Sequence, residues 1–397
     1  MAPEINNPPA DITVSVGIFA WNEQRALPAM LEALFAQSLF SRFRERGEKC
    51  EILCVANGCT DDTVAVAEQI FASQTRFHPH SAAFTARAIN LPQRGKVNAW
   101  NQFVHVLSAR CARVLFMMDA DILIRTPDTL WNMLLTLEER REATVATDLP
   151  RKHLALRPAR SLRERLSLGA SKLTHAAPGQ LCGQLYAIRA ASARNIFLPR
   201  DLTACEDGFL KAVVCADFLT GACRPGRIQL APNAEHTFEA YTSVAALIKN
   251  QKRQAMGQTI VHLLVDHILP QWPIHERRQL AEAIRAVETA DPDWLKRHIA
   301  EHLARIRFFW RLYPELLGQR FTGWKGLPLG QRCRALPAVL AGAGATLLGS
   351  FLAFRTLKSG CTDYWPRAER LGVALPTRAV SQTRPLVSAA KLGHSPE

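Results

Sequence analysis

Two aspartates separated by one residue, Asp119 and Asp121, directly follow the apolar run at residues 113–118 (RVLFMM). An almost unbroken apolar run is typical of a strand in the middle of a parallel sheet that is covered on both faces. Two carboxylates at the end of such a strand can hold a divalent cation, which keeps several waters and completes its shell with phosphate oxygens of a substrate. The spacing therefore predicts a Mg²⁺ or Mn²⁺ site for a phosphorylated substrate. The alternative is that both are ordinary turn residues.

Polar residues also follow two earlier runs that we expect to be strands, at residues 12–19 and 51–56. Ligands of α/β domains bind beyond the carboxyl ends of the strands, so we expect the three strand ends to meet at one crevice. The residues at the two earlier ends are Ala20, Asn22, Glu23, Asn57, Asp61 and Asp62. In the simplest alternative, Asp61 and Asp62 only stabilise the first turn of a helix that Thr60 caps.

Helices with one apolar face are expected around these strands. Apolar residues recur at helical spacing over residues 27–35, 64–71 and 97–107, which indicates amphipathic helices. The alternation predicts an α/β fold, Rossmann-like, in which helices flank a mostly parallel sheet.

A Gly-Lys pair, Gly95 and Lys96, precedes the last of these helices. A positive side chain beside a crevice that binds a diphosphate can contact the diphosphate oxygens. Gly-Lys is also common in exposed turns. No P-loop pattern surrounds the pair, so that kind of phosphate site is excluded.

Six short motifs, in this order, resemble those of the family 2 glycosyltransferases, which are inverting, nucleotide-sugar-dependent enzymes of the GT-A fold. They lie within residues 12–258 and read VSVGIFAWNEQRAL, VANGCTDDT, RGKVNAWN, FMMDADI, CEDGFL and NQKRQ. In the last motif, Asn250 and Gln254 replace the Gln and Trp of the family's Gln-x-x-Arg-Trp segment. The missing Trp argues against a processive polymer synthase.

The resemblance implies roles for the acidic residues. Asp207 would be the general base, and Glu206 would position it or the acceptor, although two acids can also simply stabilise a helix start. Asp121 would contact the metal most directly, whereas Asp119 would hold the ribose and the metal waters. His236 has the spacing of a late metal ligand in many GT-A enzymes, although an isolated histidine is more often structural.

Other matching positions would contact the nucleotide sugar. Asn57 stands where many relatives have an acidic residue that contacts the base, so the identity of the base stays open. Arg253 and Lys96 would brace the departing diphosphate. Gly183, in the segment 179–189 (GQLCGQLYAIR), would let the sugar approach the backbone, unless this segment is a plain strand with glycine bulges. The strand-end residues named above, from Ala20 to Asp62, would line the same site.

Composition bounds the partners and the compartment. The 397 residues include 49 Lys and Arg against 35 Asp and Glu, a net charge of +14, which attracts anionic partners. No zinc finger, RNA-binding motif or basic helix accompanies this charge, so we expect no nucleic acid partner. Ten cysteines without a CxxC pair favour a reducing compartment. The first residues lack a secretory signal, so we expect a cytoplasmic protein.

Helical patterns dominate beyond residue 258. We expect an N-terminal tail (1–11), a GT-A catalytic domain (12–258), a helical accessory region (259–330), a membrane-associated hydrophobic helix (331–360) and a basic, disordered tail (361–397). Residues 335–354 carry no charge and are long enough to span a membrane. The basic tail beyond them opposes a spanning topology. Three arrangements of this helix therefore stay open: it lies in the cytoplasmic leaflet, it spans the membrane, or it is buried within the protein.

Together these features predict an inverting glycosyltransferase at the cytoplasmic face of an anionic membrane. It would move a sugar from a nucleotide-diphosphate sugar to a lipid-linked or glycan acceptor with the help of Mg²⁺ or Mn²⁺. A Mg²⁺-dependent phosphohydrolase is a rival, although its nucleophilic Asp usually follows the first strand. A nucleotidyltransferase is a second alternative, although such an enzyme needs a Gly-rich phosphate loop after the first strand. The third is a non-catalytic membrane-surface protein with a GT-A-like fold, which would bind no nucleotide in a metal-dependent way.

Overall fold

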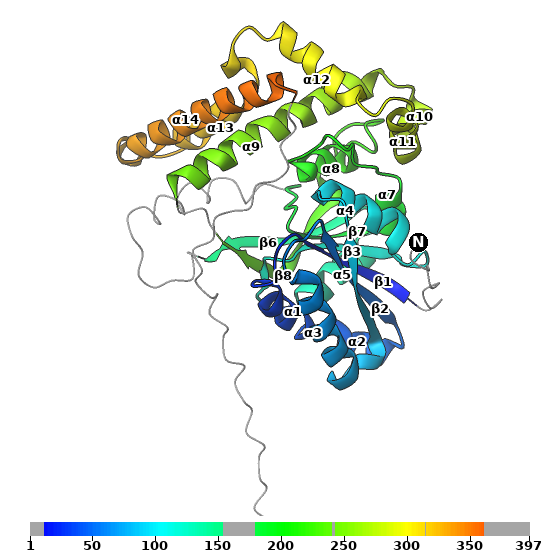
Figure 1. Cartoon of the computed structure of the whole chain (residues 1–397). Coiled ribbons are helices and arrows are strands. Elements are labelled where there is room, and N and C mark those ends of the chain that lie inside the picture. Colours follow the sequence, from blue (N-terminus) through cyan, green and yellow to red (C-terminus); the bar gives the residue numbers. More distant parts are fainter. Residues whose placement is uncertain (1–11, 154–178, 240–242, 314, 361–397) are drawn as a thin grey trace, which may run out of the picture.

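The computed structural model describes residues 12–153, 179–239, 243–313 and 315–360. Within them, eight strands form one sheet in the order β3-β2-β1-β4-β7-β6-β8-β5 (Figure 1). The strands are β1 (Ile12–Ala20), β2 (Lys49–Asn57), β3 (Phe84–Leu91), β4 (Val114–Asp119), β5 (Leu123–Ile124), β6 (Val145–Lys152), β7 (Leu185–Arg189) and β8 (Ile228–Phe238). The expected N-terminal tail and the expected tail at 361–397 lie outside the described residues.

The sheet has a parallel half and a mixed half. β1 lies between β2 and β4 and is parallel to both, and β3 adds a parallel edge to β2. β7 runs antiparallel to β4 and β6, whereas β8 is parallel to β6 and antiparallel to β5. This is the α/β class that the sequence predicted, with more antiparallel pairing than expected. Because Phe19 pairs with Asp119, the carboxyl ends of β1 and β4 lie level.

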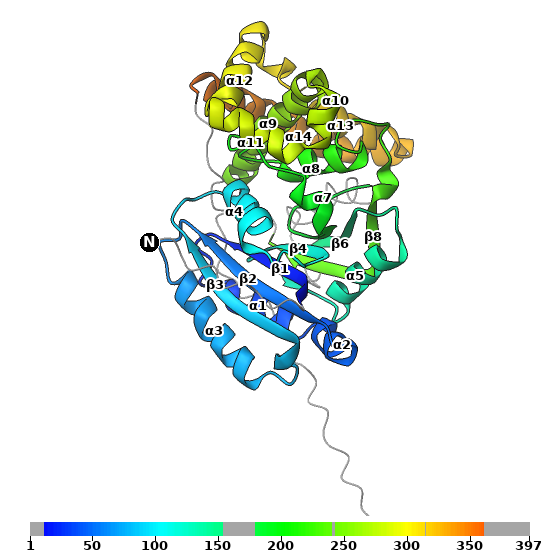
Figure 2. The ribbon, with the colours of Figure 1, turned by 90° about the vertical axis from the view of Figure 1, so that its right-hand side faces the viewer.

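Helices cover both faces of this sheet (Figure 2). On one face, residues of α1 (Leu27–Phe35), α2 (Leu39–Arg46), α3 (Thr63–Phe77) and α5 (Thr129–Glu139) form one buried apolar cluster with the sheet. On the other, residues of α4 (Lys96–Gln102), α7 (Ala190–Arg194), α8 (Glu206–Cys215) and α9 (Val244–His262) form a second. In β2, Ile52 belongs to the first cluster and Leu53 to the second, because successive strand residues face opposite ways. Burial on both faces explains the unbroken apolar runs.

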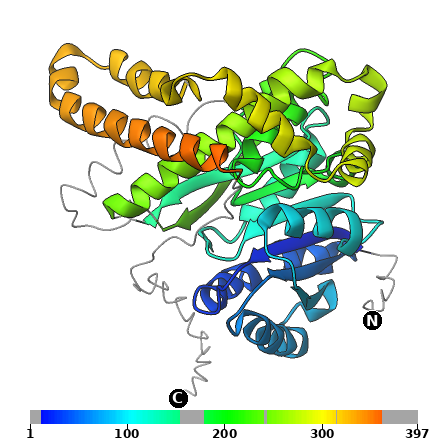
Figure 3. The ribbon, with the colours of Figure 1, turned by 45° about the horizontal axis from the view of Figure 1, so that its top comes forward.

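The C-terminal part is helical, as expected. After α9 come α10 (Ile274–Arg278), α11 (Leu280–Ala290), α12 (Trp294–Arg305), α13 (Glu315–Lys325) and α14 (Leu329–Lys358). α14 lies along α9 and α13, to one side of the sheet (Figure 3). The hydroxyl of Thr346 in α14 donates to the side-chain oxygen of Gln251 in α9 at 3.0 Å.

Close contact between α14 and α9 depends on Gly349. A Cβ added there would lie 2.6 Å from the Cβ of Gln251 and 2.8 Å from its backbone carbon. We expect Gly349→Ala to force the helices apart and to destabilise the protein by about 1–3 kcal/mol, as overpacking does. Gly344→Ala on the same helix meets no atom within 4 Å and is the matched control. Equal thermal unfolding of both variants would contradict this packing.

Candidate active site

Lys96 joins two acidic motifs that lie far apart in the sequence. Its ammonium is 2.7 Å from Oδ1 of Asp119, at the end of β4, and 2.9 Å from Oε1 of Glu206, the first residue of α8. It also donates to the backbone carbonyl of Gly183 at 2.9 Å. The Asp-x-Asp motif, the Gly-Lys segment and the Glu-Asp pair therefore meet at one point beyond the carboxyl end of β4.

Burial and charge shift the pKa values at this point. Burial would lower the pKa of Lys96, but Asp119 and Glu206 hold that pKa well above its ordinary value. Burial raises the pKa of Asp119 to about 7; Lys96 opposes this rise and the charge of Asp121 adds to it. Burial would also raise the pKa of Glu206, but Lys96 holds it below the ordinary value. Lys96 therefore carries its charge beside an ionised Glu206.

Asp207 is held in a different electrostatic state from Glu206. Burial, and then the carboxylate of Glu206, raise the pKa of Asp207. One of its carboxylate oxygens accepts a hydrogen bond from the Gly208 N–H at 2.9 Å. A Cβ on Gly183 would lie 3.2 Å from the Cβ of Asp207 and 3.3 Å from Oε1 of Glu206. Gly183 thus allows the backbone to approach the acidic pair closely, while its predicted contact with the sugar stays a prediction.

The acidic pair follows a turn that α9 packs against. Cys205 adopts a left-handed conformation, with φ of 60°, which is uncommon for a residue with a side chain. A Cβ on Gly257 of α9 would lie only 2.7 Å from the sulfur of Cys205. Also on α9, Arg253 is near enough for its charge to act on the carboxyls of Glu206 and Asp207. The structure therefore brings Arg253 to the acidic pair.

The turns after β1 and β2 are tied together by polar side chains. The Asn22 side-chain oxygen accepts from the Thr60 N–H at 2.7 Å, and the Glu23 N–H donates to the Thr63 hydroxyl at 2.8 Å. Asp61 accepts from the backbone N–H of Thr63 at 3.1 Å. Asp61 thus stabilises the start of α3, as one of the two interpretations predicted. The predicted cap was wrong: the exposed Asp62, not Thr60, directly precedes the helix. Contact of these residues with a nucleotide stays a prediction.

Asn57 fixes the end of β2. Its side-chain N–H donates to the carbonyl of Ala20 at 2.8 Å, and its side-chain oxygen accepts from the Gly95 N–H at 3.0 Å. Asn57 therefore links β1, β2 and the segment that carries Lys96, while a base contact stays a prediction. Nearby, the guanidinium of Arg94 lies 3.5 Å from the centre of the Trp21 ring.

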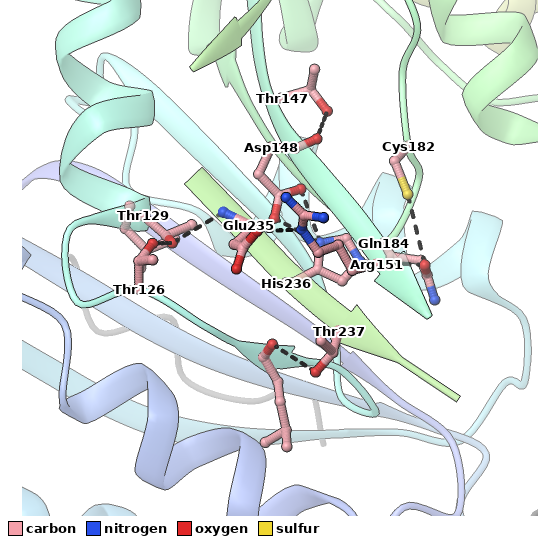
Figure 4. A network of polar contacts seen from close by, with 12 residues as sticks. Thr126, Thr129, Thr147, Asp148, Arg151, Cys182, Gln184, Glu235, His236 and Thr237 are labelled. Atoms are coloured by element: carbon pink, nitrogen blue, oxygen red, sulfur yellow. Dashed lines mark hydrogen bonds and ion pairs between the residues drawn. The ribbon is translucent and has the colours of Figure 1, made fainter. Parts of the chain in front are cut away.

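His236, on β8, forms a buried ion pair with Asp148 of β6 (Figure 4). Its Nδ1 lies 2.7 Å from Oδ2 of Asp148, and its Nε2 lies 3.4 Å from Oε1 of Gln184. Both paired side chains are fully buried. Burial would lower the pKa of His236, but Asp148 raises it to about 10. At this pKa the ring is protonated at neutral pH and donates to Asp148 through Nδ1. A role of His236 as a metal ligand stays a prediction.

This ion pair predicts a large effect on stability. Removing one partner of a buried pair leaves an uncompensated charge and costs about 3–5 kcal/mol, so we expect that loss from Asp148→Asn at neutral pH. Since the folded pKa of His236 is raised, the stabilisation is full below pH 6.5 and is lost as the pH rises through about 10. Denaturant unfolding of wild type and variant from neutral to alkaline pH checks this. As a control, Asp293→Asn, which breaks an exposed ion pair with Lys296, should change the free energy of unfolding little. If the free energies of unfolding of wild type and Asp148→Asn differed by the same amount at every pH, stability would not depend on the protonation of His236, and this prediction would be wrong.

The donor set at the end of β4 suits a hard divalent cation only in part. Among the described residues, no three His, Cys, Asp or Glu side chains are grouped closely enough to hold a metal ion. The structure therefore does not unite Asp119, Asp121 and His236 into one ligand set. The two carboxylates are hard oxygen donors, and the charge of Asp121 acts on Asp119. Such a pair fits an ion that completes its shell with waters and substrate oxygens.

Sequence reasoning missed Asp148 and Gln184, which hold the His236 ring in place. Asp148 follows Thr147 and only two apolar residues, 145–146, on its strand, a much shorter apolar run than the one before Asp119. Gln184 directly follows Gly183 and precedes β7. Its backbone carbonyl accepts from the N–H of Asp119 at 2.9 Å. Only the sheet order, which places β7 between β4 and β6, brings these residues together.

Three solved structures resemble this fold at low sequence identity. The mannosyltransferase PcManGT from Pyrobaculum calidifontis, in complex with GDP-Man and Mn²⁺, is 18% identical with a TM-score of 0.48, covering 87% of this chain and 86% of that chain. S. aureus TarS 1-349 in complex with UDP-GlcNAc is 13% identical with a TM-score of 0.39, covering 88% of this chain and 93% of that chain. The glucosyl-3-phosphoglycerate synthase from Mycobacterium tuberculosis, in complex with Mn²⁺, UDP-Glc and phosphoglyceric acid, is 16% identical with a TM-score of 0.40. The match covers 64% of this chain and 80% of that chain.

The sequence itself matches the profile described as glycosyl transferase family 2 over residues 15–183. No curated protein matches the chain. The profile match spans the three strand ends, Lys96 and Gly183. It favours glycosyl transfer over the phosphohydrolase, nucleotidyltransferase and non-catalytic alternatives. Residues 15–183 of this chain therefore match the family 2 glycosyl transferases, and this chain is a glycosyltransferase.

Proposed function

We propose that this chain transfers a sugar from a nucleoside diphosphate sugar to an acceptor hydroxyl, with inversion, by a single displacement. One observation carries the proposal. The ammonium of Lys96 lies within 3 Å of both Asp119 and Glu206, and Gly183 lies against Glu206 and Asp207. A cationic, metal-binding end of the site would thus lie next to a carboxylate that accepts protons.

Asp207 is the general base in this proposal. The acceptor oxygen bonds to the anomeric carbon as the bond from that carbon to the diphosphate oxygen breaks. The electron pair of the broken bond leaves with the nucleoside diphosphate, and the acceptor proton passes to Asp207. A positioned base of this kind contributes about 10²–10⁴-fold to the rate. The raised pKa of Asp207 suits it to accept a proton.

The leaving diphosphate would be stabilised by the positive charges around it. Lys96 and Arg253 are the basic residues that the structure brings to the acidic pair, and fixed positive charge at a departing oxyanion is often a large catalytic term. Asp121 and Asp119 would hold Mg²⁺ or Mn²⁺, which when bound supplies Lewis-acid charge to the diphosphate. His236 is proposed as a metal ligand only if donor binding releases its proton.

The acceptor is proposed to be lipid-linked or a surface glycan, reached at the cytoplasmic face of a membrane. Support comes from the net charge of +14 and from the apolar helix α14. The described residues include one helical segment, Ala335–Lys358, long and apolar enough to span a bilayer, with a mean hydropathy of 1.7.

A donor screen tests the proposed function. Thermal unfolding would be followed with UDP-, GDP- and dTDP-sugars, each with and without Mn²⁺, because a ligand that binds the native state raises its melting temperature. We expect one nucleotide class to stabilise the protein in the presence of Mn²⁺. On incubation, water should take the place of the acceptor, so that the free sugar and the corresponding nucleoside diphosphate are released. Stabilisation by no nucleotide, or binding without any release, would contradict glycosyl transfer here.

The pH dependence of turnover tests the base. Asp207 must be ionised to accept a proton, and its pKa lies above the ordinary value of 3.8. We therefore expect kcat/KM to fall as the pH is lowered through that raised pKa. Glu206→Gln removes a negative charge that raises the pKa of Asp207, so the acidic limb should move to lower pH. An acidic limb that stays in place in a pH–rate profile of this variant would exclude Asp207 as the titrating group.

A further inference from the structure

Beyond its first turn, α14 carries five large apolar side chains at the molecular surface. Their exposed fractions lie between 37% and 56%, and they are Leu336, Leu340, Leu347, Leu348 and Phe351. Positions 336, 340, 347 and 351 share one side of a helix because they follow its turns. The residues that pack inward occupy the adjoining sector of the helix: Ala343, Thr346, Ser350, Ala353 and Leu357. The exposed apolar side chains therefore border the side that holds α14 to the protein, and they are not covered by it.

Aromatic residues before α13 extend this apolar side. The ring of Phe309 meets that of Phe351 edge to face, with centroids 5.5 Å apart. Phe308 stacks on Trp310 at 4.5 Å, and these two side chains are 38% and 45% exposed. We call the five α14 residues together with Phe308 and Trp310 the α14 face.

Basic residues accompany the α14 face. Arg307 and Arg311 are exposed beside the two aromatic residues, and Arg355 and Lys358 are exposed on the last turns of α14. α14 contains no Asp or Glu over its length. Exposed Trp, Phe and Leu beside Lys and Arg are the composition of a surface that inserts shallowly into a bilayer of anionic lipids.

We propose that the α14 face docks onto an anionic lipid bilayer, with α14 lying in the plane of the membrane surface. A spanning arrangement is disfavoured because α14 is packed on α9 through Gly349 and Thr346. α9 also carries Lys249, Lys252 and Arg253, and their charges would be costly in the hydrocarbon region. A buried core helix is disfavoured because only 24% of the apolar stretch is buried within the protein.

The same helix pair links the α14 face to the acidic pair. α9 touches α14 at Gln251 and touches Cys205, next to Glu206, at Gly257. Docking would therefore hold the site close to acceptors in the leaflet. This consequence alone rests on the proposed function, because lipid binding itself requires no turnover.

Vesicle co-sedimentation of the full chain tests the docking. One set of vesicles contains phosphatidylcholine alone and the other contains phosphatidylcholine with phosphatidylglycerol. We expect binding to the anionic set, and a loss of at least about tenfold in affinity for Leu340→Gln combined with Leu347→Gln, since both lose apolar contact with lipid. Phe77→Gln, which removes a 70% exposed apolar side chain on α3, is the matched control and should bind as wild type. Arg355→Glu with Lys358→Glu should weaken binding to the anionic vesicles only.

Three outcomes would overturn the proposal. Wild-type affinity in the double Leu variant would remove the α14 face as the lipid contact. Resistance of the bound protein to extraction by high salt and alkaline carbonate would show a spanning helix instead. A dimer in light scattering that the double Leu variant abolishes, without vesicle binding, would make a second copy the occupant. Thermal unfolding of each variant confirms that it is folded, and donor binding is measured separately, so a failed glycosyl transfer assay leaves the docking result intact.

Discussion

Replacing Asp121 with asparagine should abolish the metal-dependent binding of a nucleoside diphosphate. The substitution keeps the size of the side chain but removes one of two carboxylates that would hold the cation. Losing an outer-shell partner typically costs about 10–100-fold in metal affinity, so losing a direct ligand should cost at least about 100-fold. Calorimetric titration with Mn²⁺ and the nucleoside diphosphate measures this loss.

The control for Asp121→Asn is Glu139→Gln, which makes the same change of charge at an exposed position of α5. It should bind metal and nucleotide as wild type does. Unchanged affinity in Asp121→Asn would remove the metal from the end of β4. Equal losses in both variants would point to a general effect of charge.

Replacing Asp207 with asparagine should lower kcat by at least about 10²-fold while donor affinity stays close to that of wild type. Asparagine cannot take the acceptor proton, but its side-chain oxygen can still accept from the Gly208 N–H. Steady-state release of nucleoside diphosphate, together with calorimetry of donor binding, separates the two effects.

The stability of Asp207→Asn distinguishes a catalytic loss from unfolding. The pKa of Asp207 is raised in the folded state by burial and by Glu206, so its ionised form weakens the fold near neutral pH. Asparagine removes that charge, and the variant should melt at a temperature no lower than wild type. Full turnover would exclude Asp207 as the base, whereas lost donor binding would make its role one of binding.

The apolar runs predicted the centre of the fold well. Strands β1, β2 and β4 are buried on both faces, so their sequences are apolar throughout and readily recognised. β3 was not predicted because its burial alternates at the edge of the sheet and its sequence, FTARAINL, contains no long apolar run. The antiparallel pairing of β7 was not predicted either, since strand direction depends on contacts between distant segments.

The candidate site was predicted as a set of residues but not as a set of contacts. Motif order placed Asp119, Lys96 and Glu206 in one crevice, yet the ion pairs that Lys96 makes with both carboxylates depend on how α4 and α8 pack on the sheet. The pairing of His236 with Asp148 depends likewise on β6 and β8 being neighbours. A sequence pattern indicates which residues could react, whereas the packing decides their partners.

The most direct test of inverting transfer uses water as the acceptor. Hydrolysis of the nucleotide sugar that stabilises the protein would be followed by ¹H NMR from the first minutes, before the free sugar equilibrates between its anomers. The displacement proposed here predicts that an α-linked donor first yields the β-sugar, and that Asp207→Asn suppresses its formation. First formation of the α-sugar, or a rate unchanged in Asp207→Asn, would contradict a single displacement assisted by this carboxylate.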